Sequence, residues 1–498
     1  MPPRETAAIA AWRVPAPALA AGLLAAAVAL GAWLRFTAIG GREMSADEAA
    51  SWAAAAAPSL AEVMRIQAVL NPGKLALYEI ALHDWMRLFG DGLAAMRALS
   101  AIFDTLGIVV LFVLVRELLA GPDDRAARPL APHRHAAFGG MPFAEAQMVA
   151  ALAALLLAVN LVTIKYAREL RMYPLALLLV MLQVWFFVRA VRRGGSFDLA
   201  SLAVLTALAV GAHFSAAFMV VAEALCLPAL PRMPSRRARP HRMPPPLAIA
   251  AALGAGAALF VMLALPALRT GASAFAHGAT SWIERPPWWE PAAMFNKATG
   301  TFAFPVMIVL WGWGVWRGWR RAPRQVAFAL VWMWAPPVLM LLASYAFSPM
   351  LVERYALWCF APFFMLAALG AWELRTGWAR AGAIGLMVAL ALGHLHAYRR
   401  RPHDSQWREA ARAAASAVAP GATIAVAPPY AVNVVRYYLR HTRAAGAAVP
   451  AGDSGAAVLL IGDQWKARDK AAKLLARYPQ PLAGFRGVRV RGRRTRAE

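Results

Sequence analysis

Long uncharged apolar runs alternate with short polar segments along most of the chain. A run of about 18 or more such residues can cross the hydrocarbon core of a bilayer as a helix. The run 199–230 is longer than one span needs and contains His213 and Glu223, which predicts two short spans meeting near His213. The pattern therefore predicts about 11 transmembrane helices. They are expected at residues 14–34, 98–115, 146–164, 172–188, 199–230 (two), 247–268, 302–316, 325–352, 355–372 and 381–397.

The pattern changes after residue 397. Short apolar stretches alternate there with helix-like segments, which indicates a small α/β domain. The arginine-rich stretch 486–496 is interpreted as a solvated end. We predict a transmembrane domain at 1–397, with a first outer loop at 36–97, and a soluble domain at 398–498. The elements expected in the soluble domain are strands at 423–427 and 456–461 and helices at 404–418, 432–439 and 465–476.

Composition agrees with a membrane protein but adds an unusual charge. Hydrophobic residues make up 60% of the chain and charged residues only 16%, and the mean hydropathy is +0.51. Soluble domains are less apolar and more charged, and disordered chains are poor in apolar residues. The two cysteines exclude a disulfide framework and a thiolate zinc site. The formal net charge of +26 remains to be explained.

The distribution of basic residues predicts an orientation. Short cytoplasmic loops carry an excess of Lys and Arg. With the N-terminus inside, the inner loops are almost purely basic, and the outer loops contain most of the acids. The soluble domain then lies outside, and it carries 19 basic and 6 acidic side chains, a net charge of +13. The expected inner loops are 120–145, 189–197, 231–246 and 317–324, and the outer loops are 35–97, 165–171, 269–301 and 352–354.

The first outer loop holds the most informative acids, the adjacent pair Asp47 and Glu48. A carboxylate just outside a membrane can accept a proton from an acceptor hydroxyl or hold a divalent cation. On the dipeptide alone, a surface helix with solvated acids is the favoured interpretation. Within the spans, Asp104 and Glu223 are functional candidates by default, because ionisable groups are costly in a membrane. The alternative is that each pairs with an internal cation, and neither is selected as a site residue. His213 is either a packing histidine or part of a site.

The order of several motifs adds a resemblance to a known family. The chain resembles the polytopic GT-C glycosyltransferases, close to the bacterial protein mannosyltransferase and aminoarabinose transferase group (glycosyltransferase family 39-like). The resemblance covers roughly residues 15–375 and implies a GT-C-type helical bundle. The family's His-Pro-Pro is absent, and Lys74-Leu75-Ala76 takes its place. The matching motifs are Asp47-Glu48, Leu77-Tyr78, Trp85 with Leu88-Phe89-Gly90, Glu169-Leu170-Arg171-Met172-Tyr173 and Arg354-Tyr355.

The resemblance implies a membrane glycosyltransferase (EC 2.4). Such an enzyme moves a sugar from a polyprenyl-phosphate donor to a lipid, glycan or protein acceptor on the extracytoplasmic face. The resemblance assigns the base to Asp47 and makes Glu48 a supporting carboxylate or a metal contact. Arginine and lysine at the outer boundary would bind the donor phosphate. Those candidates are Arg171, Arg354, Lys74 and Arg168, and the expected site-lining residues are Tyr78, His83, Glu169, Tyr173, His213 and Tyr355.

Several points stay open in the sequence. A divalent metal ion is neither required nor excluded as a cofactor, and the sugar and acceptor are not identified. Besides donor and acceptor, membrane lipids are the expected partners, and nucleic acid is not, because the basic domain lies outside. The expected location is the bacterial inner membrane, with the active site and the C-terminal domain on the periplasmic side. The alternative function is a polytopic lipid or small-molecule transporter or flippase, although no repeated halves are visible.

Overall fold

The computed structural model describes residues 16–121, 140–229, 245–276, 283–300, 302–400, 405–452, 455–463, 465 and 467–493. The chain divides into two compact units. Most of the predicted first outer loop belongs to the same unit as the C-terminal domain. The first unit is Met1–Thr37, Asn71–Tyr78 and Ala98–Tyr398, and the second is Ala38–Leu70, Glu79–Arg97 and Arg399–Glu498.

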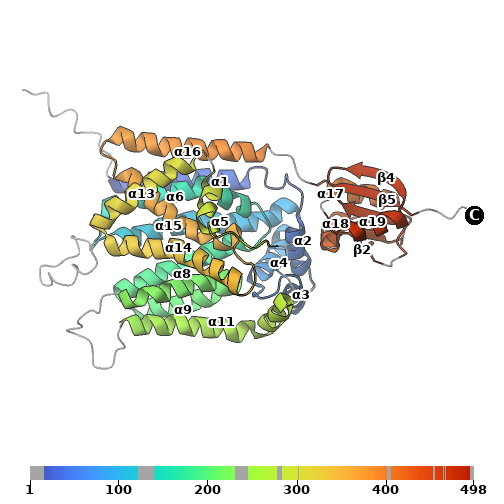
Figure 1. Cartoon of the computed structure of the whole chain (residues 1–498), viewed down its shortest axis with the longest axis horizontal. Coiled ribbons are helices and arrows are strands. Elements are labelled where there is room, and N and C mark those ends of the chain that lie inside the picture. Colours follow the sequence, from blue (N-terminus) through green and yellow to red (C-terminus); the bar gives the residue numbers. More distant parts are fainter. Residues whose placement is uncertain are drawn as a thin grey trace, which may run out of the picture. The chain divides into compact units, whose positions relative to one another are not determined.

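Long helices that run alongside one another make up the first unit (Figure 1). In the described part of the chain, seven helical segments are long and apolar enough to cross a membrane. Each coincides with a predicted span, which confirms a mainly helical, multi-pass architecture. They are α1 (Ala16–Phe36), α5 (Leu93–Leu119), α8 (Tyr173–Arg193), α11 (Pro245–Ala276), α14 (Pro323–Ala346), η5 with α15 (Glu353–Cys359 and Phe360–Trp372) and α16 (Gly377–Arg399).

The other predicted spans correspond to interrupted helices. Two bent helix pairs bring the number of candidate spans among the described residues to nine. The two spans predicted within residues 199–230 are short apolar helices separated by His213. The extended backbone of His213 confirms the predicted break. The bent pairs are α6 with α7 (Phe143–Val159 and Leu161–Ala167) and α12 with α13 (Glu290–Thr299 and Phe304–Arg321). The short helices are α9 (Ser196–Ala212) and η3, α10 and η4 (Phe214–Ala216, Ala217–Cys226 and Leu227–Ala229).

Two glycines allow α13 and α15 to pack closely. A Cβ atom on Gly314 would lie 1.9 Å from the carbonyl oxygen of Leu366, and one on Gly370 would lie 1.8 Å from that of Leu310. No side chain fits at either position. Small residues at helix crossings are typical of membrane bundles, where close packing replaces the hydrophobic effect as the driving force.

The buried acids of the bundle have polar partners. Asp104 accepts a hydrogen bond of 2.5 Å from Nε of Arg35, and both side chains are buried. The alternative given for Asp104, pairing with an internal cation, is therefore confirmed. Glu223 instead accepts a hydrogen bond of 2.5 Å from the amide of Gln183. Pairing matters here because removing one member of a buried pair leaves an uncompensated charge.

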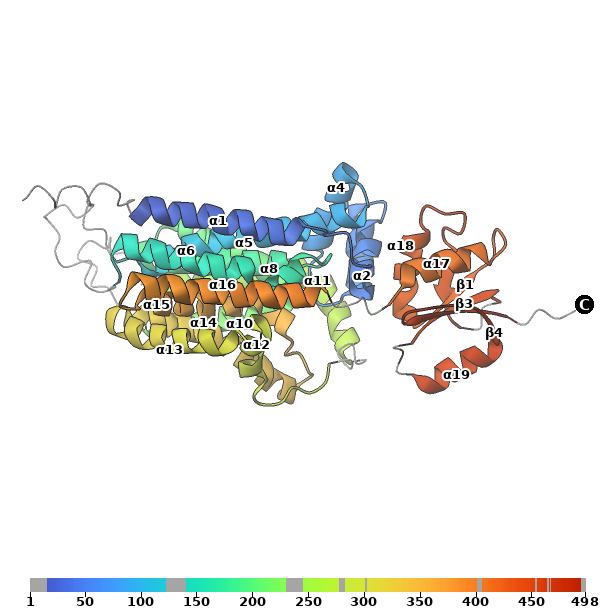
Figure 2. The same ribbon diagram turned by 90° about the horizontal axis from the view of Figure 1, so that it is seen from above.

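The C-terminal part of the second unit is the predicted α/β domain. Its five-stranded sheet has the order β2-β1-β3-β5-β4, with β1 parallel to β2 and β3 and the remaining pairs antiparallel. Figure 2 shows α17 and α18 on one face of the sheet and α19 on the other. The elements are α17 (Trp407–Ser416), β1 (Ile424–Ala427), α18 (Val432–Leu439), β2 (Ala448–Pro450), β3 (Val458–Gly462), α19 (Arg468–Arg477), β4 (Gln480–Phe485) and β5 (Val488–Gly492).

One prediction for this domain was wrong. The stretch 486–496, interpreted as a solvated end, contains β5, which pairs with both β3 and β4. Val488 and Val490 are fully buried, whereas Arg489 and Arg491 alternate with them. This is the period of two expected for a strand with one buried face. The high arginine content hid that alternation in the sequence.

Three helices of the first outer loop complete the second unit. They are α2 (Ala46–Ala55), α3 (Leu60–Leu70) and α4 (Leu77–Phe89), of which α4 begins in the first unit. Helix α2 packs against α3 and against α18 of the C-terminal domain. The helices of the first outer loop (the acidic loop) therefore pack against the C-terminal domain.

Candidate functional site

The acidic pair lies in the first turn of α2, and its two members differ. Ser45 caps this helix: its hydroxyl accepts from the backbone N–H of Glu48, and the Glu48 carboxylate accepts from the N–H of Ser45 at 2.8 Å. This reciprocal capping box fixes the start of the helix. Glu48 is buried, whereas Asp47 is exposed. A negative charge at a helix N-terminus is also stabilised by the helix dipole.

Arg97 holds Glu48 in place. Its guanidinium donates to both oxygens of the Glu48 carboxylate, at 2.7 and 2.9 Å, and both side chains are 2% exposed. It also donates to the carbonyl oxygens of Ile39, Arg42 and Glu43, at 2.9–3.0 Å. Arg97 therefore gathers the segment before α2 around one buried cation. Arg97 was not among the predicted site residues, because a lone arginine at the start of a span is most often an interfacial residue.

The C-terminal domain contacts the same segment. The Glu43 carboxylate accepts from the backbone N–H of Trp407 at 2.7 Å, which caps the start of α17. The backbone N–H of Met44 donates to the hydroxyl of Tyr438 at 2.8 Å. The ring of Trp52 meets the edge of Tyr437 with centroids 5.3 Å apart. The helix that carries Asp47 is thus bounded by Arg97 on one side and by α17 and α18 on another.

The carboxyl groups of Glu43 and Glu409 share a proton where this segment meets α17. Burial, together with the hydrogen bond that protonated Glu43 donates to the Glu409 carboxylate, raises the pKa of Glu43 from 4.5 to about 7. Two carboxyl groups in hydrogen-bonding contact cannot both ionise cheaply, so the pair retains one proton more tightly than an isolated carboxyl group. Near neutral pH, the contact between the loop and α17 is therefore sensitive to protonation.

A second group of predicted residues meets within the first unit. The rings of His213 and Tyr355 lie 4.5 Å apart, and Tyr173 lies 5.8 Å from His213. The guanidinium groups of Arg171 and Arg354 lie 5.6 and 5.8 Å from the Tyr173 ring. We call this group the cation–aromatic cluster. Its members are Lys74, Arg171, Tyr173, His213, Arg354 and Tyr355.

The cluster concentrates positive charge. Lys74, Arg171 and Arg354 all lie close enough to His213 to act on it electrostatically. Lys74, Arg171 and His213 are buried. Like charges held together in a low-dielectric region repel one another strongly. Such an arrangement suits the binding of an anion, and Arg and Lys are the side chains that contact phosphate.

Neighbouring residues fix Arg171 from both its side chain and its backbone. Both terminal nitrogens of its guanidinium lie 3.3 Å from the side-chain oxygen of Asn71. The hydroxyl of Ser100 donates to the carbonyl oxygen of Arg171 at 3.1 Å and lies 2.7 Å from the hydroxyl of Tyr78. The predicted site-lining residue Tyr78 therefore contacts the cluster indirectly, through Ser100 and the backbone of Arg171.

Lys74 reaches the cluster on a loop that is fixed to α9. The backbone N–H of Leu75 donates to the carbonyl oxygen of Gly211 at 2.9 Å. A Cβ atom on Gly211 would lie 2.8 Å from the Leu75 side chain, so only glycine admits this approach. Lys74 is 5% exposed. The sequence that replaces the family's His-Pro-Pro thus places its lysine beside the predicted phosphate-binding arginines.

Three predicted residues lie apart from the cluster contacts just described. His83 belongs to the second unit, where its Nδ1 lies 2.8 Å from the carbonyl oxygen of Ala55 at the end of α2. Arg168 donates to carbonyl oxygens at the end of α1, including that of Thr37 at 2.6 Å. This gives Arg168 a capping role. Glu169 lies in the turn between α7 and α8, two residues before Arg171.

The described residues do not provide a metal-binding set. Among them, no group of three or more His, Cys, Asp or Glu side chains is arranged to hold a metal ion. Asp47 and Glu48 are adjacent, but the carboxylate of Glu48 is committed to Arg97 and Ser45.

Comparison with solved structures identifies the fold. The chain aligns with ArnT, an aminoarabinose transferase, from Cupriavidus metallidurans in the apo state, at 12% identity and a TM-score of 0.58, covering 95% of this chain and 98% of that one. The same protein bound to undecaprenyl phosphate aligns with a TM-score of 0.59, 12% identity and coverage of 94% and 98%.

An archaeal protein shares the fold less closely. It is the oligosaccharyltransferase AglB from Archaeoglobus fulgidus, in complex with an inhibitory peptide and a dolichol-phosphate, with a TM-score of 0.51 and 11% identity. The alignment covers 92% of this chain and 71% of that one. No protein-family model matches the sequence, and no curated protein matches it by sequence. The chain has the GT-C fold of these transferases, as the sequence resemblance predicted.

Proposed function

We propose that this protein is a membrane glycosyltransferase that uses a polyprenyl-phosphate-linked sugar. The observation that carries the proposal is the cation–aromatic cluster, in which Lys74, Arg171 and Arg354 gather around His213. The shared fold supports it, because the ArnT and AglB structures contain undecaprenyl phosphate and dolichol-phosphate, respectively. A lipid phosphate is an anion on a membrane-held chain, and this unit combines buried cations with apolar helices.

The cations have a defined task in this reaction. When the sugar leaves its donor, negative charge develops on the departing polyprenyl phosphate. Preformed cations at that position stabilise the transition state more than the ground state. Arg171 and Arg354 offer planar forks to phosphate oxygens, and Lys74 offers a point charge. Arg168 contributes least, because it already caps α1.

The aromatic members of the cluster set the position of the cations. Tyr173 lies against both guanidinium groups. The Ser215 hydroxyl, which lies 2.6 Å from Nδ1 of His213, donates to the carbonyl oxygen of Tyr355 at 2.7 Å. Preorganisation of this kind avoids the cost of orienting the donors during the reaction. We assign Tyr173, His213 and Tyr355 to positioning, and Tyr78 and Glu169 to the surroundings of Arg171.

The base is assigned to Asp47. It is exposed at the start of α2, where an acceptor hydroxyl can reach it. Its neighbour Glu48 cannot serve equally, because Arg97 and Ser45 engage the oxygens of its carboxylate. Glu48 is therefore a positioning residue, and His83 supports the far end of the same helix. Deprotonation of the acceptor by Asp47 would permit a single displacement at the anomeric carbon with inversion.

The remaining parts of the proposal follow from the sequence. The acceptor is a lipid, a glycan or a protein, and transfer takes place on the extracytoplasmic side of a bacterial inner membrane. The orientation is supported by basic loops at one end of the helices and acids at the other.

The deciding experiment replaces Asp47 with Asn in the full-length protein. Membranes containing the protein are supplied with radiolabelled polyprenyl-phosphate sugars, and transfer to any acceptor is measured. Loss of a positioned general base costs roughly 10²- to 10⁴-fold in rate. The matched control is Asp84→Asn, an equally small change at an exposed acid of α4 in the same unit. We expect the control to keep full activity.

Two outcomes would contradict the proposal. Unchanged sugar transfer by Asp47→Asn would remove Asp47 as the base. Failure of the unaltered protein to transfer any sugar, together with movement of a labelled lipid or solute across reconstituted vesicles, would favour a transporter instead.

A further inference from the structure

A pocket lies at the end of the first unit where α8 finishes and α14 begins. Its volume is about 220 Å³, and its walls come mainly from α8, α10 and α14. The stacked rings of Phe187 and Phe328, with centroids 5.5 Å apart, join α8 to α14 along one wall. We call this the basic-end pocket, because α8 and α13 both end there in consecutive arginines.

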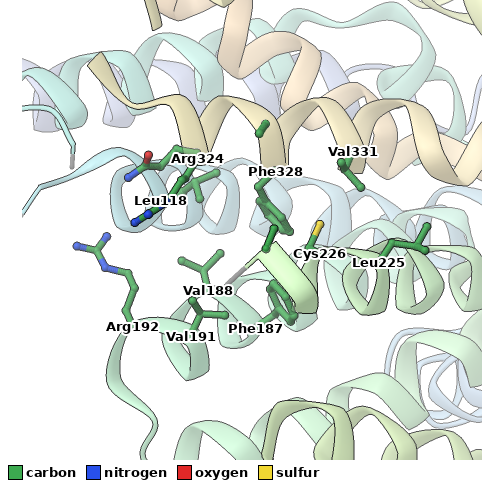
Figure 3. Close-up of a pocket in the computed structure, with 13 residues that line it drawn as sticks. Leu118, Phe187, Val188, Val191, Arg192, Leu225, Cys226, Arg324, Phe328 and Val331 are labelled. Atoms are coloured by element: carbon green, nitrogen blue, oxygen red, sulfur yellow. The ribbon is translucent and has the colours of Figure 1, made fainter. Parts of the chain in front are cut away.

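The two ends of the pocket differ in character. Figure 3 shows Arg192 and Arg324 at one end, and Leu225 and Val331 at the other. Leu225 is 62% exposed on the outer surface of the bundle, so the apolar end is accessible to the surrounding hydrocarbon. An apolar channel that ends in cations is complementary to an amphiphile with an anionic head group.

Of the two arginines, Arg324 remains available for that head group. Among the described residues, Glu117 at this end is paired with Arg193, and Glu373 is paired with Arg317 and Arg321. Arg192 donates to the carbonyl oxygens of Glu117 and Ala120 at the end of α5.

Arg324 is exposed. Within the described part of the chain it forms no ion pair or hydrogen bond. An arginine at the interface is suited to a phosphate.

The basic-end pocket is separate from the cation–aromatic cluster. Helix α8 carries Tyr173 at one end and Arg192 near the other, 19 residues later. At a rise of 1.5 Å per residue the two positions are about 28 Å apart, close to the thickness of the hydrocarbon core. One lipid phosphate cannot contact both, so an occupant of the pocket belongs to the opposite leaflet.

We propose that the basic-end pocket binds a phospholipid of the surrounding bilayer, with its phosphate on Arg324 and part of an acyl chain beside Phe187 and Cys226. A cavity of roughly 150 Å³ with apolar walls is enough to hold a benzene molecule. The volume here holds a segment of a chain and leaves the head group at the arginine end. Bilayer phospholipids are the phosphate-bearing chains that surround every face of the bundle. This binding is independent of the proposed transfer reaction.

Cys226 provides a direct test, because it lines the pocket, whereas Cys359, the other cysteine, is completely buried. The purified full-length protein, in an uncharged detergent, is treated with a maleimide, and alkylation is measured separately at each cysteine by mass spectrometry. Dioleoyl phosphatidylglycerol is then added, or dioleoylglycerol, which has the same chains and no phosphate. We expect phosphatidylglycerol to protect Cys226 at a several-fold lower mole fraction.

A matched pair of variants localises the phosphate. Arg324→Ala should raise the phosphatidylglycerol concentration needed for protection roughly fivefold, as expected for the loss of one interfacial cation. Arg320→Ala, also an exposed arginine at this end but not part of the pocket wall, should leave it unchanged. Three results would overturn the proposal: equal protection by dioleoylglycerol, no effect of Arg324→Ala, or stronger protection by undecaprenyl phosphate than by the phospholipid.

Discussion

The carboxylates around α2 and the cations of the cation–aromatic cluster differ in how their charges are compensated. Around α2, a buried cation, Arg97, neutralises the buried acid Glu48 and leaves the neighbouring Asp47 exposed. In the cluster, Lys74, Arg171 and Arg354 act together on one histidine, so like charges are gathered. The first arrangement stabilises a helix, whereas the second accumulates a positive potential.

The difference separates one buried ion pair from a group of cations that share aromatic neighbours. A bidentate, buried arginine–carboxylate pair engages its donors and acceptors internally, so Arg97 and Glu48 are structural. The guanidinium groups of Arg171 and Arg354 instead lie against the ring of Tyr173, and Asn71 also contacts that of Arg171. Arg97 and Arg171 both lie at the boundary of a predicted span, and their contacts distinguish their roles.

Apart from loss of the base Asp47, we expect the largest effect from Arg97→Ala, which should lower the stability of the second unit. Removing one partner of a buried ion pair leaves the Glu48 carboxylate uncompensated and costs about 3–5 kcal/mol. The segment before α2 also loses three hydrogen bonds to backbone carbonyls. We expect lower thermal stability and faster hydrogen exchange across residues 38–55, measured by mass spectrometry.

The control for this variant is Arg87→Ala, which removes an exposed arginine from the last turn of α4. It should change stability by less than about 0.5 kcal/mol. If Arg97→Ala exchanged no faster than this control, the assignment of Arg97 as the structural centre of the acidic loop would be wrong.

A smaller and more specific effect is expected in the cluster. Arg171→Ala should weaken donor binding and transition-state stabilisation by about 1.5–3 kcal/mol, because a charge-assisted phosphate contact is lost. The fold should survive, since Asn71 and Tyr173 remain. Kinetics with a polyprenyl-phosphate sugar should show a raised KM and a lowered kcat. Arg354→Ala should behave in the same way.

Replacing Arg171 with lysine tests whether the phosphate needs a planar, two-pronged guanidinium contact or only a positive charge. Arg171→Lys retains the charge and should recover only part of the activity, because lysine cannot contact two phosphate oxygens in a plane. Full recovery would indicate that charge alone matters at this position. Arg168→Lys serves as the comparison, and we expect it to affect stability at the end of α1 more than KM.

Local sequence patterns predicted the helices of the fold better than its long-range strand pairing. Apolar runs predicted the positions of the helices, and the break at His213 was predicted because an ionisable residue interrupts an overlong run. The strand β5 was missed, since its exposed arginines masked the alternation of Val488 and Val490. Long-range register, such as the pairing of β5 with β3, leaves no local pattern.

The site residues were predicted unevenly for the same reason. Motif order selected Asp47, Arg171 and Arg354, and the structure brings Arg171 and Arg354 together around Tyr173. Arg97 carries no motif, because its importance comes from burial against Glu48, 49 residues away in the chain. The attachment of the acidic loop to α17 and α18 was likewise unpredictable, since it joins residues nearly 400 positions apart.

That attachment yields the smallest expected effect, which concerns pH. Burial and the hydrogen bond with Glu409 raise the pKa of Glu43 to about 7, from 4.5. The groups facing Glu43 are Glu409, the Tyr438 hydroxyl and Arg408, besides the backbone of Trp407. The folded contact binds a proton more tightly than the separated segments do. Its contribution is therefore complete below about pH 4.5 and is lost as the pH rises through 7.

Hydrogen exchange of α17, corrected for the intrinsic exchange rate at each pH, measures this directly. Protection of residues 407–416 should fall between pH 5 and pH 8 by about 1 kcal/mol, a value reduced for the partial solvent exposure of Glu43. Glu43→Gln keeps a neutral side chain of the same shape at every pH, so it should remove most of the slope. Glu62→Gln, at a partly exposed acid of α3 that pairs with Arg65, should keep it. A slope that persisted in Glu43→Gln would mean that another group titrates, and the acidic loop would then be held by its uncharged contacts and Arg97 alone.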